Sequence, residues 1–219
     1  MVEVLPKFFL YGPENPEQFM AQAAFIIRPA GNYHFYSLKD AEPSLDWFYS
    51  FGGVRKQFLT DVRTVLPGAR RIFFKFGAPA VSTSLQREDR HQHSDLLVEL
   101  YDEMDLSDVE LIPLRLDEEG NHCWYLLTHE GKRILFSGAS VVLDHGRIGF
   151  CEHPPRFNRL LEVLDEIEGQ PVDYWIPERY RGVQRYLESS PIQWEELIQA
   201  LRRKWRTKTS SLRVINPMD

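Results

Sequence analysis

His91, His93 and Asp95 have the residue types and the spacing of a metal-binding segment. In the run His-Gln-His-Ser-Asp, alternate residues of an extended loop point to one side, and imidazole and carboxylate groups are ordinary ligands of zinc, manganese and iron. A bound ion of this kind would lower the pKa of a water molecule and supply hydroxide for hydrolysis. The segment lies among charged residues, however, and a solvated polar loop is the interpretation that we favour.

Two further groups of reactive residue types have simpler explanations. His122 and Cys123 cannot form a nucleophile–base pair, because neighbours in a strand point to opposite faces. We expect Cys123 in the core and His122 toward a cleft or solvent. The run 144–146, Asp-His-Gly, is typical of a turn, although loops at strand ends gather near functional sites. The sequence has no serine nucleophile elbow, dinucleotide-binding motif or Walker motif, so nucleotide-dependent chemistry has no support.

The elements that must position these residues alternate between strands and helices. Short apolar runs bounded by turn residues predict strands, and apolar residues at helical spacing predict helices. The predicted strands span 23–29, 32–36, 54–60, 71–76, 96–100, 109–116, 124–128, 133–138 and 172–176, with 77–95 mainly loop. The predicted helices span 43–51, 157–167 and 193–205. This mixed order indicates a layered α/β (α+β) class.

The order of elements and several short segments resemble the metallo-β-lactamase fold superfamily. The strand 54–60 ends in Leu-Thr, and the hairpin 123–138 ends in Leu-Phe-Ser-Gly, as in that family. The resemblance spans about residues 20–205 and implies an αββα four-layer sandwich. We therefore expect a single domain over 1–219, in which an amphipathic basic helix over 190–208 precedes a flexible tail over 209–219.

The positions that match the family's metal ligands hold other residues. Asp61 and Arg63 stand where the first motif has histidines, Asp117 lies near the third histidine, Ala139 replaces the bridging aspartate, and Arg179 replaces the last histidine. An alanine offers no lone pair and an arginine repels a cation. The resemblance therefore implies cleft residues without the binuclear centre and without a cofactor. We hypothesise that Arg63 or Arg179 pairs with Asp61 or Asp117 across the cleft.

Charge and composition limit the classes of partner. The net charge is −6, with 17 basic and 28 acidic residues in 1–178 against 9 and 4 in 179–219. An acidic body argues against nucleic-acid binding. No apolar run reaches the length of a membrane span and no signal peptide is apparent, so we expect a cytoplasmic protein. The two cysteines, Cys123 and Cys151, are too few for a disulfide framework.

Two functional hypotheses follow. The first is a non-catalytic protein that uses the emptied hydrolase scaffold to bind an unknown protein or small-molecule partner. The alternative is a metallo-β-lactamase-type hydrolase with a relocated or mononuclear site holding zinc, manganese or iron. Its ligands would come from Asp61, Asp117, Asp144, His145 or the 91–95 segment. Dimerisation through a strand edge or the C-terminal helix stays open.

Overall fold

The structure is a computed structural model that describes most of the chain. The described residues are 1–13, 17–36, 38, 42–61, 67–82, 98–100, 110–118, 120–150 and 157–212. Among them, no helix has both the length and the apolar character needed to span a bilayer. The predicted residues Arg63, His91, His93, Asp95 and Cys151 lie outside the described ranges.

The N-terminal half forms one mixed sheet. Its strand order is β1-β2-β4-β5-β6-β7-β8, antiparallel from β1 to β5 and parallel from β5 to β8. The bounds are β1 Val2–Leu5, β2 Phe8–Tyr11, β4 Ala23–Ile26, β5 Tyr33–Phe35, β6 Lys56–Phe58, β7 Ala80–Ser82 and β8 Val98–Leu100. The β4–β5 hairpin was predicted from the sequence and is confirmed.

The C-terminal half forms most of two smaller sheets, and β3 of the N-terminal half joins one of them. One has the order β16-β14-β11-β10-β9 and the other the order β13-β12-β15-β3. The bounds are β3 Met20–Ala21, β9 Leu111–Arg115, β10 Cys123–His129, β11 Lys132–Phe136, β12 Val141–Asp144, β13 Arg147–Phe150, β14 Tyr174–Ile176, β15 Arg179–Arg181 and β16 Leu187–Glu188. The predicted β10–β11 hairpin is confirmed, and Glu130 and Gly131 form its tight turn at positive φ.

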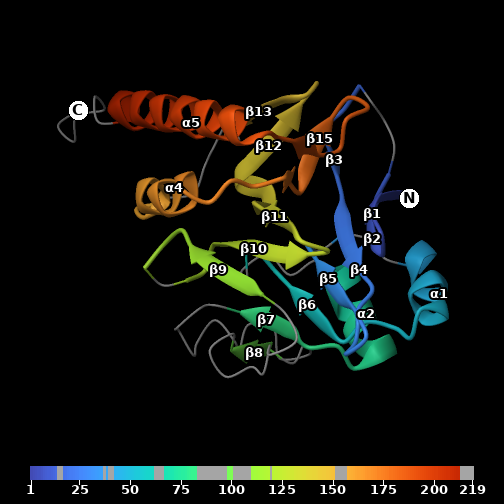
Figure 1. The fold of residues 1–219 in the computed structure, drawn as a ribbon. Coiled ribbons are helices and arrows are strands. Elements are labelled where there is room, and N and C mark those ends of the chain that lie inside the picture. Colours follow the sequence, from blue (N-terminus) through green and yellow to red (C-terminus); the bar gives the residue numbers. More distant parts are fainter. Residues whose placement is uncertain are drawn as a thin grey trace.

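Helices cover the outer faces of the sheets (Figure 1), with α1 and α2 on the N-terminal side and α4 and α5 on the C-terminal side. Their bounds are α1 Glu42–Ser50, α2 Pro67–Phe76, α4 Leu160–Glu168 and α5 Pro191–Leu212, and a short 3₁₀ turn, η2, spans Gly138–Ser140. The predicted α/β class with αββα layers is confirmed. Helix α5 extends four residues beyond the predicted end of the basic helix.

The strand β10 explains why the sandwich needs both helical layers. Cys123 and Tyr125 point into the core between the sheets, whereas Trp124 and Leu126 point toward α4 and α5. All four are buried, because alternate residues of the strand meet a different apolar layer on each face. In the central core, the ring of Phe136 stacks on a phenyl ring of the N-terminal sheet at a centroid distance of 4.0 Å.

The strand predicted for 71–76 is wrong, because this run is the second half of helix α2. Ala69 and Ile72 are buried three residues apart, while Phe74 is 70% exposed. Pro67 begins the helix, where its missing N–H costs nothing. The aromatic run gave a short apolar segment whose periodicity does not separate strand from helix. Strand β7 then follows inside the segment predicted as loop.

Candidate functional site

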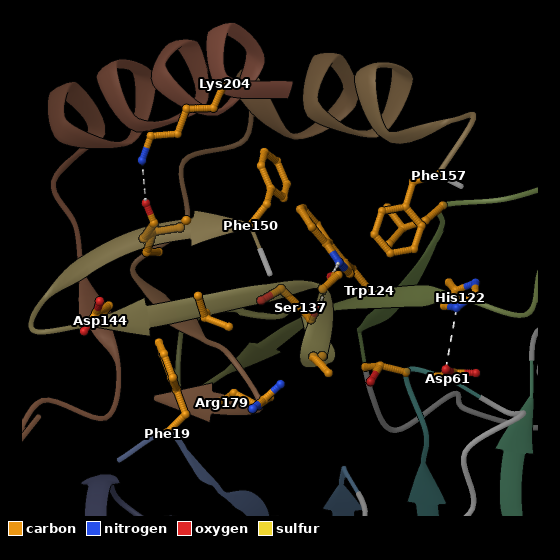
Figure 2. A pocket seen from close by; sticks show the side chains of 18 of the residues that line it. Phe19, Asp61, His122, Trp124, Ser137, Asp144, Phe150, Phe157, Arg179 and Lys204 are labelled. Carbon is orange, nitrogen blue, oxygen red and sulfur yellow. Dashed lines mark hydrogen bonds and ion pairs between the residues drawn. The ribbon is translucent and has the colours of Figure 1, made fainter. Parts of the chain in front are cut away.

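A cavity of about 810 Å³ lies where strands of the two halves end. Its wall is built from the residues after β6, the turn η2, strands β12, β13 and β15, and one residue of α5 (Figure 2). The lining residues are Phe19, Thr60, Asp61, Leu116, His122, Trp124, Ser137, Gly138, Ala139, Ser140, Val142, Asp144, Arg147, Ile148, Gly149, Phe150, Phe157, Arg179, Arg181 and Lys204. The volume suits a small organic molecule.

At one end of the cavity, the imidazole of His122 lies between two carboxylates. Its Nδ1 is 2.5 Å from Oδ2 of Asp117, and its Nε2 is 3.5 Å from Oδ2 of Asp61. A backbone bridge between Asp61 and His122 fixes this approach, and the ring of Phe157 packs edge-on against the imidazole. The position of His122 is therefore set by both of its neighbours and by the backbone.

Asp117 also closes the turn that precedes β10. Its carboxylate accepts the backbone N–H groups of Asn121 and His122, at 2.8 and 3.1 Å. Burial by itself would raise the pKa of Asp117, but the hydrogen bonds from His122 and Asn121 outweigh burial and lower the pKa below its usual value. Asp117 is thus a buried carboxylate that orients His122 and does not line the cavity itself.

Glu178 lies beside this group, after β14. Loss of hydration and the nearby charge of Asp61 raise its pKa to about 7, against the lowering influence of Arg179 and of a hydrogen bond with Thr60. The side chain therefore changes its charge near neutral pH. It places a second acidic group beside Asp61, although its side chain does not line the cavity.

Another part of the cavity wall is cationic and aromatic. Arg179 and Arg181 place their guanidinium carbons 5.8 and 4.7 Å from the ring centroid of Phe19. Arg181 also donates two hydrogen bonds to Asp144, at 2.7 and 2.5 Å, so these two residues neutralise each other. The ammonium of Lys204 donates to a backbone carbonyl of β13 at 3.2 Å.

The floor of the cavity is held by indole–hydroxyl hydrogen bonds. The indole of Trp124 donates to Ser140 Oγ at 2.9 Å, and Ser140 Oγ donates to the carbonyl of Ser137 at 2.7 Å. The indole of Trp175 donates to Ser137 Oγ at 2.6 Å. Each serine hydroxyl is thus held by an indole, and the hydrogen bonds fix the η2 turn.

The structure brings some of the sequence-predicted residues together. Asp61, Ala139 and Arg179 all line the cavity, and Asp117 lies behind His122. The described partner of Asp117 is His122, and the hypothesised pairing with Arg63 concerns a residue outside the described ranges. Cys123 is buried in the core as expected.

The predicted turn at 144–146 is confirmed, because Asp144 ends β12 and His145 and Gly146 have positive φ. Sequence reasoning missed Glu178, Phe19, Arg147 and Lys204 as members of the site. Glu178 had a local signal, since it precedes Arg179, which matches a metal-ligand position of the family. The other three had none, because they come from elements that only the fold assembles.

The described residues do not fit the family's metal centre. No three histidine, cysteine, aspartate or glutamate side chains among the described ranges are arranged to hold an ion. Both ring nitrogens of His122 face carboxylates, Ala139 has no donor atom, and Arg179 carries a positive charge.

Comparison with solved structures identifies the fold. A motif mutant of the metallo-β-lactamase from Cronobacter sakazakii has a TM-score of 0.67 at 13% identity, over 98% of both chains. The metallo-β-lactamase from Pontibacter korlensis has a TM-score of 0.63 at 11% identity, over 90% of this chain and 97% of the other. The flavodiiron protein from Giardia intestinalis reaches 0.61 at 10% identity, over 94% and 59%. No protein-family model and no curated protein sequence matches the chain.

This chain therefore has the metallo-β-lactamase fold, as the sequence resemblance implied. At such low identity the likeness defines the architecture and leaves the activity open.

Proposed function

We propose that this chain is a binding protein that holds a small molecule in the cavity and does not use a binuclear metal centre. One observation carries the proposal: a cavity of about 810 Å³ is lined by Asp61, Ala139 and Arg179, which the sequence resemblance matches to metal-ligand positions of the family. The floor of this cavity is fixed by hydrogen bonds from buried indoles. A pre-formed cavity of this size favours ligand binding, because little order must be imposed when the ligand enters.

A ligand screen with a blocked variant tests the proposal. Thermal unfolding of the full chain is followed in the presence of a library of small metabolite-like molecules, since a ligand that binds only the folded state raises Tm. Ala139→Phe places a ring in the cavity from an exposed position of the η2 turn, and Ala30→Phe places the same ring at an exposed turn that does not line the cavity. We expect ligands that stabilise the wild type and Ala30→Phe but not Ala139→Phe. Ligands that raise the Tm of Ala139→Phe as much as that of the wild type would contradict the proposal.

The alternative function is a metal-dependent hydrolase with a relocated or mononuclear site. One observation favours it: Asp61 and Nε2 of His122 face each other, and Asp117 contacts the other ring nitrogen. In metal sites, a carboxylate commonly orients a ligating histidine in this way. This pair supplies two ligands, whereas catalytic zinc sites use three from the protein.

Metal content and turnover distinguish the two functions. Protein purified without chelators is offered zinc, manganese and iron, and its metal is measured by plasma mass spectrometry. It is then assayed with thioesters, lactones and phosphodiesters. Stoichiometric metal together with turnover that Asp61→Ala abolishes would replace the binding proposal by the hydrolase.

A further inference from the structure

Three cations that line the cavity form no ion pair with another described residue. Arg147, Arg179 and Lys204 come from β13, β15 and α5, whereas Arg181 is paired with the carboxylate of Asp144. The protein as a whole is acidic, with a net charge of −6. A local excess of positive charge inside an acidic molecule makes the cavity a focus for anions.

Aromatic rings lie next to these cations on two sides of the cavity. In Figure 2, Phe150 and Phe157 lie toward the helices, whereas Phe19 lies with Arg179 on the side of the N-terminal sheet. Phe150 and Phe157 are fixed from behind by the indole of Trp205, at centroid distances of 5.2 and 6.0 Å. These rings offer apolar faces for a planar group, and stacking of that kind adds to the burial of apolar area.

The exposure and the contacts of Phe19 independently favour an aromatic ligand. It is 39% exposed, and both guanidinium groups of β15 lie within 6 Å of its ring centroid. An exposed phenyl ring costs free energy unless apolar surface covers it, and Phe19 lines the cavity. A planar ligand ring would cover Phe19 and lie beside the arginines at the same time.

We propose, resting on the binding function above, that the ligand is a planar aromatic molecule with one anionic group, held by Arg147, Arg179 and Lys204. The ring packs against Phe19 and the phenyl groups near α5. Asp61 also lines the cavity and repels a second negative charge, so the site favours a ligand with a single anionic group. The charge-assisted hydrogen bonds supply the preference over a neutral molecule of the same shape.

Isothermal titration calorimetry with two matched probes tests this ligand class. The probes are 2-naphthoate and 2-naphthalenemethanol, which share the ring system and differ in the anionic group. At low salt we expect 2-naphthoate to bind about tenfold more tightly, which corresponds to one charge-assisted hydrogen bond. We expect 0.5 M sodium chloride to narrow the difference, because exposed charges are screened.

A pair of variants separates the cavity from general charge. Arg179→Gln removes a cavity cation, whereas Arg203→Gln removes an exposed charge of α5 that does not line the cavity. We expect Arg179→Gln to abolish the preference for 2-naphthoate and Arg203→Gln to keep it. Equal binding of the two probes would overturn the ligand class while leaving the binding function standing. Loss of the preference in Arg203→Gln to the same extent, or binding of neither probe, would overturn the ligand class as well.

Discussion

Gly138, at the start of the η2 turn, offers a sharp test of how the site is built. Its φ is +62°, and a Cβ atom added there would lie 2.7 Å from Cβ of Thr60 and closer still to its Oγ1. We expect Gly138→Ala to cost about 1–2 kcal/mol for the left-handed backbone. Overpacking against the end of β6 adds about 1–3 kcal/mol. The expected loss in the free energy of unfolding is therefore about 3 kcal/mol.

Gly131 in the β10–β11 turn is the matched control. Its φ is +71°, but nothing lies within 4 Å of the added Cβ. Gly131→Ala should therefore cost only the backbone contribution of about 1–2 kcal/mol. Urea unfolding followed by tryptophan fluorescence measures both variants. Equal losses for Gly131→Ala and Gly138→Ala would refute the close approach between Gly138 and Thr60.

A double-mutant cycle tests whether the loss in Gly138→Ala comes from contact with Thr60. Thr60→Gly removes the three atoms nearest to the new Cβ, so it should recover about 1–2 kcal/mol of the Gly138→Ala loss. The hydrogen bond between Thr60 and Glu178 is lost in both arms of the cycle and cancels. A coupling energy near zero would assign the whole loss to backbone strain.

Three other perturbations follow from the structure. The pKa of Glu178 is raised to about 7 in the folded protein, against about 4.5 in the unfolded chain, so the free energy of unfolding should fall as pH rises from 4.5 through 7. Urea unfolding of the wild type and of Glu178→Gln at pH 5 and pH 8 measures this fall, and we expect the variant to lose about 3 kcal/mol of it. The pKa of Asp117 is lowered, so its contribution to the free energy of unfolding is present above pH 4 and lost in acid. Asp117→Asn should lower the free energy of unfolding by about 2–3 kcal/mol at pH 7 and flatten its dependence on pH in acid. Trp194 is 1% exposed and donates to the carbonyl of Ile167, so Trp194→Ala should cost about 3–5 kcal/mol and lower Tm by about 6–20 °C in calorimetry, whereas exposed Ile192→Ala should change Tm little.

The sequence by itself determined the elements whose pattern is local and strong. The β10–β11 hairpin has apolar runs on both sides of a glycine turn, and α5 has apolar residues such as Trp194 and Ile198 at helical spacing. In both cases the interactions that select the structure lie within a few residues of each other. The layered class followed from the alternation of these elements. The family resemblance added the αββα four-layer sandwich.

Only the tertiary structure decided the composition of the site. Asp61 meets His122 across about sixty residues of chain, and Phe19 meets Arg181 across about 160. Lys204 joins the cavity because α5 packs its apolar face on the sheet that carries β12 and β13. No local pattern encodes such a meeting, since it depends on how the layers stack and where the strands end. The same limit explains α2, whose short aromatic run suits either a strand or a helix until Ala69 and Ile72 find their place against the sheet.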